Sequence, residues 1–167
     1  MFHAETAAGA FVVPAANGRV VHVLGNEVRI KISSRDTGGA FTVFEGQTRP
    51  LQGPPLHRHP KHNEWWYIVE GEYKFVIDGR EVYARAGDIV FAPRGSAHTF
   101  QNVGTGTGRT LTTVIPGGVD LFFEELETAA PRGRIPDREK MVAIFKKHDQ
   151  ELLGPRLDYP ASGPRPE

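Results

Sequence analysis

Short apolar runs recur along most of the chain, and they limit its fold more than any other feature. About nine runs rich in β-branched and aromatic residues follow one another roughly ten residues apart, with glycines and prolines dispersed between them. They cover residues 19–24, 27–33, 40–46, 64–71, 72–78, 81–86, 88–93, 97–103 and 109–116. Gly25-Asn26 and Asp78-Gly79 are dipeptides typical of two-residue hairpin turns. The pattern predicts an all-β fold of antiparallel strands, in a sandwich, jelly roll or barrel.

The organisation of the chain predicts one domain. Its 167 residues suit a single domain, 1–167, and the sequence contains no internal repeat. We place the β barrel core at about residues 19–116 and a C-terminal helical segment at about residues 119–153. The Pro-rich tail, residues 154–167, is expected to be extended and flexible.

Two segments near the C-terminal end predict helices. Residues 119–129 are expected to form a helix capped by Asp120. Apolar residues at helical spacing predict a second helix over residues 137–154. Asp137 is its expected N-cap and Gly154 its expected end.

The composition excludes several classes of protein. The absence of cysteine excludes disulfides, thiolate metal sites and a cysteine nucleophile. Lys and Arg together number 20 and Asp and Glu also number 20, so the charge balance gives no reason to expect a nucleic-acid or membrane partner. The N-terminus has no basic region followed by an apolar core, and no apolar run approaches the ~20 residues of a membrane span. We therefore expect a soluble cytoplasmic protein whose partner is a small-molecule substrate.

Three of the seven histidines lie close together in the stretch PPLHRHPKHNEWWYIVEGE, residues 54–72. Residues two apart in a strand point to the same face, so His57 and His59 can direct both imidazoles at one point. Glu64 would bring a carboxylate to that point if the next strand folds back beside them. Taken alone, these residues are compatible with a metal site or with polar surface beside a Pro-rich loop. His62 is interpreted as an exposed turn residue.

A second stretch, GDIVFAPRGSAHTFQN, adds a histidine at a defined spacing. It fits the pattern G-x5-P-x-G-x2-H-x3-N, with fixed positions at Gly87, Pro93, Gly95, His98 and Asn102. This pattern matches the second conserved motif of the cupin superfamily at every fixed position. The pattern H-x-H-x4-E-x6-G over residues 57–71 resembles the first cupin motif, which usually begins with a glycine where this chain has Leu51.

The resemblance to cupins covers about residues 19–116 and implies a fold and a metal site. Flanking segments make the chain similar to a narrower group, the small single-domain bacterial cupins that resemble quercetin 2,3-dioxygenase. The implied fold is a double-stranded β-helix, or jelly-roll barrel. Pro93 and Gly95 would then shape the turn that delivers His98, and Asn102 would satisfy backbone groups.

The resemblance further implies that His57, His59, Glu64 and His98 meet in the barrel mouth and bind one divalent metal ion. Three imidazoles and a carboxylate suit Fe, Mn, Ni, Co, Cu or Zn, whereas Mg and Ca prefer more oxygen ligands. One or two positions on the ion would remain open for substrate and for dioxygen or water. Glu64 is also the candidate catalytic residue, because a carboxylate with a raised pKa would act as general base.

Strand alternation predicts an apolar pocket around this metal. Inward-facing Glu64 implies that Trp66 and Ile68 also face inward, while Trp65 and Tyr67 face outward. Inward-facing His98 implies the same for Phe100. From residues 40–46, either Phe41 and Val43 or else Thr42 and Phe44 face the interior; we take Phe41 and Val43 as the pocket candidates. The outward aromatic residues are expected to pack against other elements or against a partner subunit, and a homodimer is expected.

Three functions remain open at this point. The first, implied by the quercetinase-like resemblance, is a metal-dependent dioxygenase or related oxidoreductase acting on a small aromatic or enolic substrate. The second keeps the metal as a Lewis acid in a non-redox isomerase, hydrolase or lyase. The third is a non-enzymatic cupin that binds a small ligand.

Overall fold

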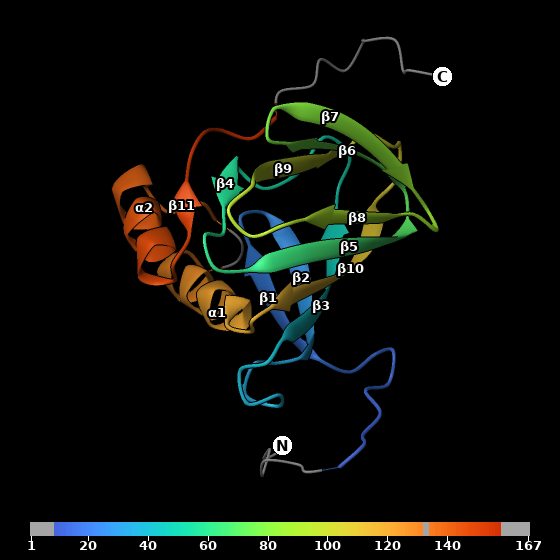
Figure 1. Cartoon of the computed structure of the whole chain (residues 1–167), viewed down its shortest axis with the longest axis vertical. Helices are drawn as coiled ribbons and strands as arrows, with labels where there is room; N and C mark the ends of the chain where they lie inside the picture. The colour runs from blue at the N-terminus through green and yellow to red at the C-terminus, as the bar shows by residue number, and fades with distance from the viewer. Residues whose placement is uncertain (1–8, 132–133, 158–167) are drawn as a thin grey trace.

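Two antiparallel β-sheets and two helices make up the computed structural model, which describes residues 9–131 and 134–157 (Figure 1). The six-stranded sheet contains, in spatial order, β1 (Arg19–Val23), β2 (Asn26–Ile32), β3 (Thr42–Thr48), β10 (Gly108–Ile115), β5 (Asn63–Glu70) and β8 (Ile89–Ala92). The five-stranded sheet contains, in order, β11 (Glu151–Leu152), β4 (His57–Arg58), β9 (Ala97–Asn102), β6 (Glu72–Ile77) and β7 (Arg80–Arg85). The predicted all-β architecture with a C-terminal helical segment is confirmed.

The two predicted hairpins are present, one of them shifted by a residue. Asp78 and Gly79 occupy the turn between β6 and β7, both with positive φ (48° and 78°). The turn between β1 and β2 is made by Leu24 and Gly25, with φ of 51° and 88°, and Asn26 already belongs to β2. Positive φ at both central positions matches the twist of the flanking strands, which explains the choice of turn.

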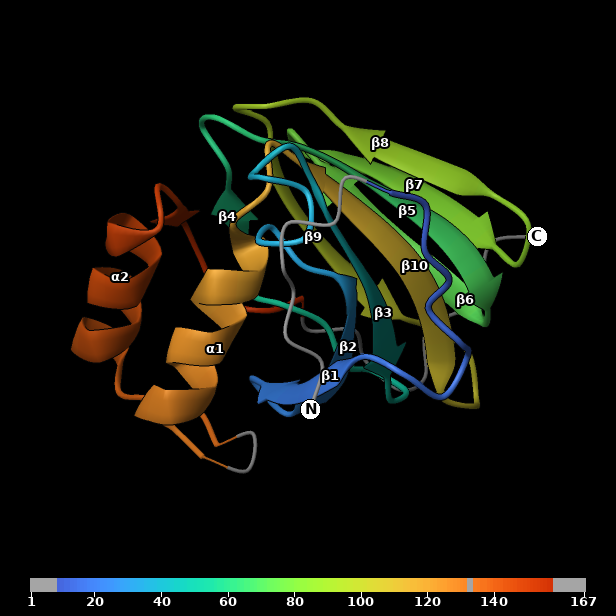
Figure 2. The ribbon, with the colours of Figure 1, turned by 90° about the horizontal axis from the view of Figure 1, so that it is seen from below.

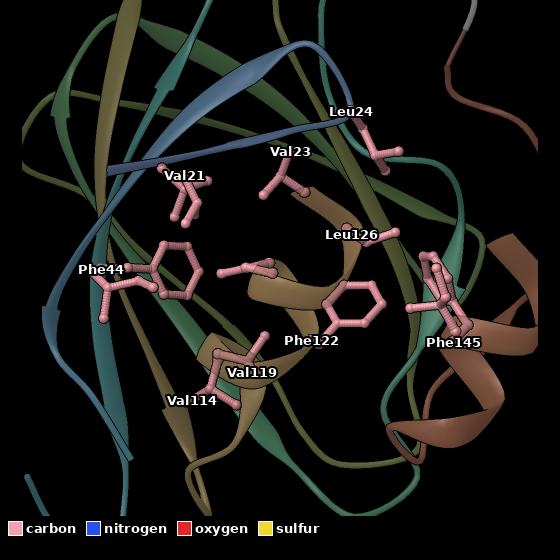
Figure 3. Close-up of a cluster of buried hydrophobic side chains, with 13 residues drawn as sticks. Val21, Val23, Leu24, Phe44, Val114, Val119, Phe122, Leu126 and Phe145 are labelled. Carbon is pink, nitrogen blue, oxygen red and sulfur yellow. The ribbon is translucent and has the colours of Figure 1, made fainter. Parts of the chain in front are cut away.

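The side chains of the two sheets and the helices enclose two apolar clusters. In β5, Glu64, Trp66 and Ile68 are buried and Tyr67 is exposed, as strand alternation predicted. Trp66 and Ile68 belong to a cluster between β5, β6, β7 and β8. The other cluster joins the strands around β1 to the helices, and Figure 3 shows its side chains pointing toward one another.

The helices α1 (Val119–Ala129) and α2 (Arg138–Lys147) lie together beside one end of the sheets (Figure 2). Asp137 caps α2 as predicted, because its carboxylate accepts a hydrogen bond from the Lys140 N–H at 2.8 Å. Asp120 does not cap α1: its side chain is fully buried and accepts hydrogen bonds from other elements.

The second helix ends earlier than the sequence predicts. It stops at Lys147, and Asp149 takes a left-handed conformation with φ of 55°. Leu152 then pairs with His57 in the β11–β4 ladder, so the last apolar residue of the predicted helical pattern serves a strand instead. The expected helix over residues 137–154 is therefore too long.

The part of the tail that the structure describes is held against the barrel. The Gln101 amide donates to the Leu157 carbonyl at 3.0 Å, and the Arg156 guanidinium donates to the Gln52 amide oxygen at 2.9 Å. The remainder of the predicted flexible tail, residues 158–167, lies outside the described residues. No helix in the described part of the chain is long and apolar enough to cross a membrane.

Candidate metal centre

Neighbouring strands bring four polar side chains to one buried point. His57 lies on β4 and pairs directly with His98 on β9, while Glu64 comes from β5 in the opposite sheet. His59 follows β4 in the turn that leads to β5. One potential ligand atom from each of these residues lies within 4.8 Å of the others. The structure thus brings together the four residues that the resemblance to the cupin motifs implies as metal ligands.

The imidazoles are oriented as metal ligands would be. The Nδ1 atom of His57 lies 2.9 Å from the Pro55 carbonyl oxygen, and that of His98 lies 3.1 Å from the Ser96 carbonyl oxygen. These contacts assign the proton to Nδ1 and leave Nε2 free to bind an ion. Glu64 Oε2 lies 3.2 Å from His59 Nε2 and 3.3 Å from His98 Nε2.

A transition metal fits this donor set. Glu64 Oε2 and His98 Nε2 are buried and form no well-directed hydrogen bond with the described residues, although they are close together. Atoms that converge on a common point without bonding one another are arranged for a shared ion. Two orienting backbone carbonyls behind the histidines complete the surroundings that such sites usually have.

The electrostatics of the site favour an ionised Glu64 and a neutral His57. Burial alone would raise the pKa of the Glu64 carboxyl, but His59 and His98 beside it hold that pKa well below its usual value. Burial, with the neighbouring His98 and His59, lowers the pKa of His57 well below its usual value. This direction is opposite to the raised pKa that a general base would need, and an ionised carboxylate is suited to bind a metal ion.

An apolar cavity of about 100 Å³ adjoins three of the four polar residues. Its walls carry the metal-site residues His57, His59 and Glu64 together with six phenylalanine and tryptophan side chains from both sheets and both helices. The aromatic residues are Phe44, Trp66, Phe100, Phe122, Phe123 and Phe145. No lysine or arginine is among its described lining residues.

Two of the five predicted pocket residues line this cavity. Trp66 and Phe100 do so, and the Trp66 ring packs edge-on against His98 at 5.4 Å between ring centroids. Ile68 faces inward as predicted but lies deeper, in the neighbouring apolar cluster.

The choice of Phe41 and Val43 as inward-facing pocket residues needs correction. β3 pairs with β10 so that Thr42 faces Val114 and Phe44 faces Thr112, and these four side chains are buried. Phe44 lines the cavity, whereas Phe41 lines a separate surface cavity and Val43 lines neither. The pairing register selects the other of the two alternations that the sequence left open.

The helices supply walls that the sequence motifs did not indicate. Val119, Phe122 and Phe123 from α1 and Phe145 from α2 close one side of the cavity, and Gln150 comes from the segment before β11. The Phe145 ring lies 6.2 Å from the His57 ring and 4.8 Å from the Phe122 ring. The only sequence signal for these wall residues was the apolar pattern of the helical segment. That pattern indicated that the helices pack against the barrel, but not that they line a cavity.

His62 is not an exposed turn residue. It is partly buried, and its ring lies 5.8 Å from that of His59. With His59, His148 and Gln150 it lines a second, more polar cavity of about 210 Å³.

The second motif plays the structural roles that the resemblance implied. Gly95 has φ of 85°, and its N–H donates to the His59 carbonyl at 2.8 Å, so the turn also fixes the loop that carries a ligand. The Asn102 amide donates to the Thr48 and Gly106 carbonyls, each at 2.8 Å. Leu51, where the first motif usually has glycine, keeps a left-handed backbone with φ of 62°.

Comparisons with known proteins agree with this site and fold. The family model described as "Cupin domain" matches residues 43–114. The chain is 26% identical to quercetin 2,3-dioxygenase of Bacillus subtilis over 98 residues, which cover 59% of the chain and 29% of that protein. It is 31% identical to polyketide synthase CurC of Streptomyces cyaneus over 97 residues, covering 57% of the chain and 63% of CurC. The matches thus span less than two thirds of either relative.

A solved structure from Thermotoga maritima, described as a predicted oxalate decarboxylase, has a TM-score of 0.56 with 25% identity. The match covers 64% of this chain and 99% of that one. The relatives differ in the activities that their names describe. Residues 43–114 therefore form a cupin domain, which carries a buried cluster of three histidines and a glutamate that could hold a metal ion.

Proposed function

We propose that this cupin is a metal-dependent dioxygenase, or related oxidoreductase, that acts on a small aromatic or enolic substrate. The observation that carries the proposal is the apolar, aromatic-lined cavity directly beside three of the four ligands, His57, His59 and Glu64. Such a cavity with a few polar groups at one end is the usual form of a small-molecule site. The 26% identity with quercetin 2,3-dioxygenase supports the choice of reaction.

The metal would be held by His57, His59, Glu64 and His98 and would be a first-row transition ion, Fe, Mn, Ni, Co, Cu or Zn. Such an ion supplies Lewis acidity and, where it is redox-active, a route for electrons between substrate and dioxygen. The ionised Glu64 offsets part of the ion's charge. The surrounding aromatic side chains exclude water from the substrate.

The charges of the cavity disfavour oxalate as the substrate. The metal ion would pair with one carboxylate of such a dianion, but the other would lie in the cavity, where no lysine or arginine is among the described lining residues. The carboxylates of Glu27 and Glu64 on the walls would repel it. An uncharged molecule with one metal-binding oxygen fits these walls better.

The size of the cavity favours a substrate of about one ring. Its volume of about 100 Å³ is below the ~150 Å³ of an engineered apolar cavity that binds benzene. A flavonol with several rings is larger than this volume. We therefore favour single-ring phenols, catechols and small enols over flavonols.

Oxygen uptake by metal-reconstituted protein tests the proposal. Metal-free protein is loaded separately with each of the six ions and mixed with catechols, small enols, flavonols or oxalate. We expect substrate-dependent oxygen consumption with a redox-active ion, none with Zn, and no loss of CO2 from oxalate. Turnover that Zn supports without oxygen consumption would instead establish a non-redox reaction.

A further inference from the structure

One of the three histidines at the metal centre has no partner for its second nitrogen. The Nδ1 atoms of His57 and His98 contact backbone carbonyls, but that of His59 is buried and has no hydrogen-bond partner among the described residues. The His59 side chain is 3% exposed, so bulk water does not take the partner's place. Histidines that bind metals almost always donate this N–H to an acceptor that fixes the ring.

A buried acceptor without a donor lies on the same cavity. Gln150 is 4% exposed, and its Oε1 atom has no hydrogen-bond partner among the described residues. The residue is held in place by its backbone, because the Gln150 N–H donates to the Phe145 carbonyl at 2.9 Å. Both His59 and Gln150 line the apolar cavity beside the ligands and the polar cavity of about 210 Å³.

Most other polar groups on the polar cavity are already paired. Lys147 and His148 both contact the Glu125 carboxylate, and Asp149 contacts Lys61 at 2.9 Å. The exception is His62, whose Nδ1 atom is buried and has no partner in the described part of the chain. The cavity is large enough to hold ordered water, and a water in it needs two to four polar partners such as these unpaired atoms.

We propose that Gln150 is a positioning residue for the metal ligand His59. The His59 Nδ1–H donates to a water in the polar cavity, and that water donates to Gln150 Oε1. The bridge fixes the ring so that Nε2 faces the ion, and it makes the imidazole a better donor to the metal. The inference rests on the metal site of the proposed function, and it involves neither substrate nor oxygen.

Metal affinity in Gln150 variants tests this assignment. Gln150→Leu removes the acceptor at similar volume, and Gln150→Glu keeps an acceptor oxygen. Dissociation constants for Co(II) and Zn(II) are measured by competition with a chelator, and the Co(II) absorption spectrum reports ligand geometry. We expect Gln150→Leu to weaken binding by about 10–100-fold and change the spectrum, and Gln150→Glu to remain near the natural protein.

Two comparison variants separate positioning from general destabilisation. Gln101 is an equally buried glutamine whose amide bonds the Leu51 and Leu157 carbonyls, away from both cavities. Gln101→Leu should lower stability but leave metal affinity within twofold. Equal losses of metal affinity in Gln101→Leu and Gln150→Leu would overturn the proposal. The second comparison variant is His62→Leu: a loss of metal affinity in this variant but not in Gln150→Leu would also overturn it. If metal binding depends on Gln150 but no substrate causes oxygen uptake, this inference is supported and the proposed reaction is contradicted.

Discussion

Each ligand at the metal centre is individually unfavourable to bury without an ion. An ionised carboxylate loses much hydration in an apolar interior, and Glu64 is 6% exposed. His57 is held neutral by burial and by its two histidine neighbours, so it cannot offset the charge of Glu64. A cation bound by the four residues would supply that charge, which accounts for their arrangement around one point.

Removing His98 is expected to abolish stable metal binding. His98→Ala deletes one imidazole and leaves three ligands, so stoichiometric metal should fall to a small fraction in protein purified in the presence of a chelator. Elemental analysis measures this directly. His22→Ala is the matched control, because His22 is exposed on β1 and its imidazole lies 3.5 Å from the Glu127 carboxylate, outside the metal-site cluster. One metal per chain in a His57→Ala, His98→Ala double variant would rule out the site.

Tyr73 is expected to titrate late and to make stability fall at high pH. Burial raises the pKa of Tyr73 to about 12, above its value of about 10 in an unfolded chain. The neutral phenol is favoured in the folded state, so the free energy of unfolding is highest below pH ~10 and decreases between ~10 and ~12. Urea unfolding at a series of pH values should show this decrease in the natural protein but not in Tyr73→Phe. Identical pH profiles for the two proteins would refute the assignment.

At the scale of elements, a buried carboxylate joins α1 to the six-stranded sheet. Asp120 accepts hydrogen bonds from the Ser34 N–H at 3.1 Å, the Ser34 hydroxyl at 2.9 Å and the Thr42 hydroxyl at 2.9 Å. All three residues are buried. This contact holds the start of α1 where Val119 and Phe122 close the cavity.

We expect Asp120→Ala to be strongly destabilising. Each buried donor left unpaired costs about 1–3 kcal/mol, so the free energy of unfolding should fall by at least that amount in urea titrations. Glu139→Ala, which removes an exposed carboxylate from α2, should change it by less than about 0.5 kcal/mol. A similar small change in Asp120→Ala would show that the network contributes little.

The positions of the strands could be predicted from the sequence, because the alternation of apolar and polar residues is a local pattern. Which face of a strand points toward the interior could not always be predicted. In β5 the orientation followed from Glu64, which is tied to the histidine motif. β3 carries apolar residues on both faces, so its sequence allowed either Phe41 and Val43 or Thr42 and Phe44 to point inward. The pairing of β3 with β10, a long-range contact, decides between them.

The C-terminal wall of the site was harder to predict for the same reason. The ligands His57, His59, Glu64 and His98 lie in two motifs with fixed spacing, so local sequence was sufficient. Gln150 belongs to no such motif, and it reaches the site because Leu152 pairs with His57 across the β11–β4 ladder. The apolar pattern over residues 137–154 predicted a continuous helix, so the turn at Asp149 that makes this pairing possible was not predicted.

At the scale of the molecule, an apolar face remains exposed on the outer side of the six-stranded sheet. Leu111, Tyr67 and Ile89 form one row across β10, β5 and β8, and Thr113, Trp65 and Phe91 form the next. Ile89 is 68% exposed and Phe91 54% exposed. Contiguous apolar surface of this kind usually marks an interaction site.

We propose that a second copy of the chain covers this face in a two-fold symmetric dimer, the commonest arrangement among homo-oligomers. The six side chains of these two rows carry no charge, so two copies of the face can pack against each other in an isologous interface. Light scattering should give twice the 18.4 kDa chain mass for the natural protein and the single-chain mass for Phe91→Glu. Val82→Glu, on β7 outside this face, is the matched control and should stay dimeric. A natural protein that is monomeric at high concentration would contradict this assignment. So would a Phe91→Glu variant that remains dimeric, because burying an unpaired carboxylate in an interface is strongly unfavourable.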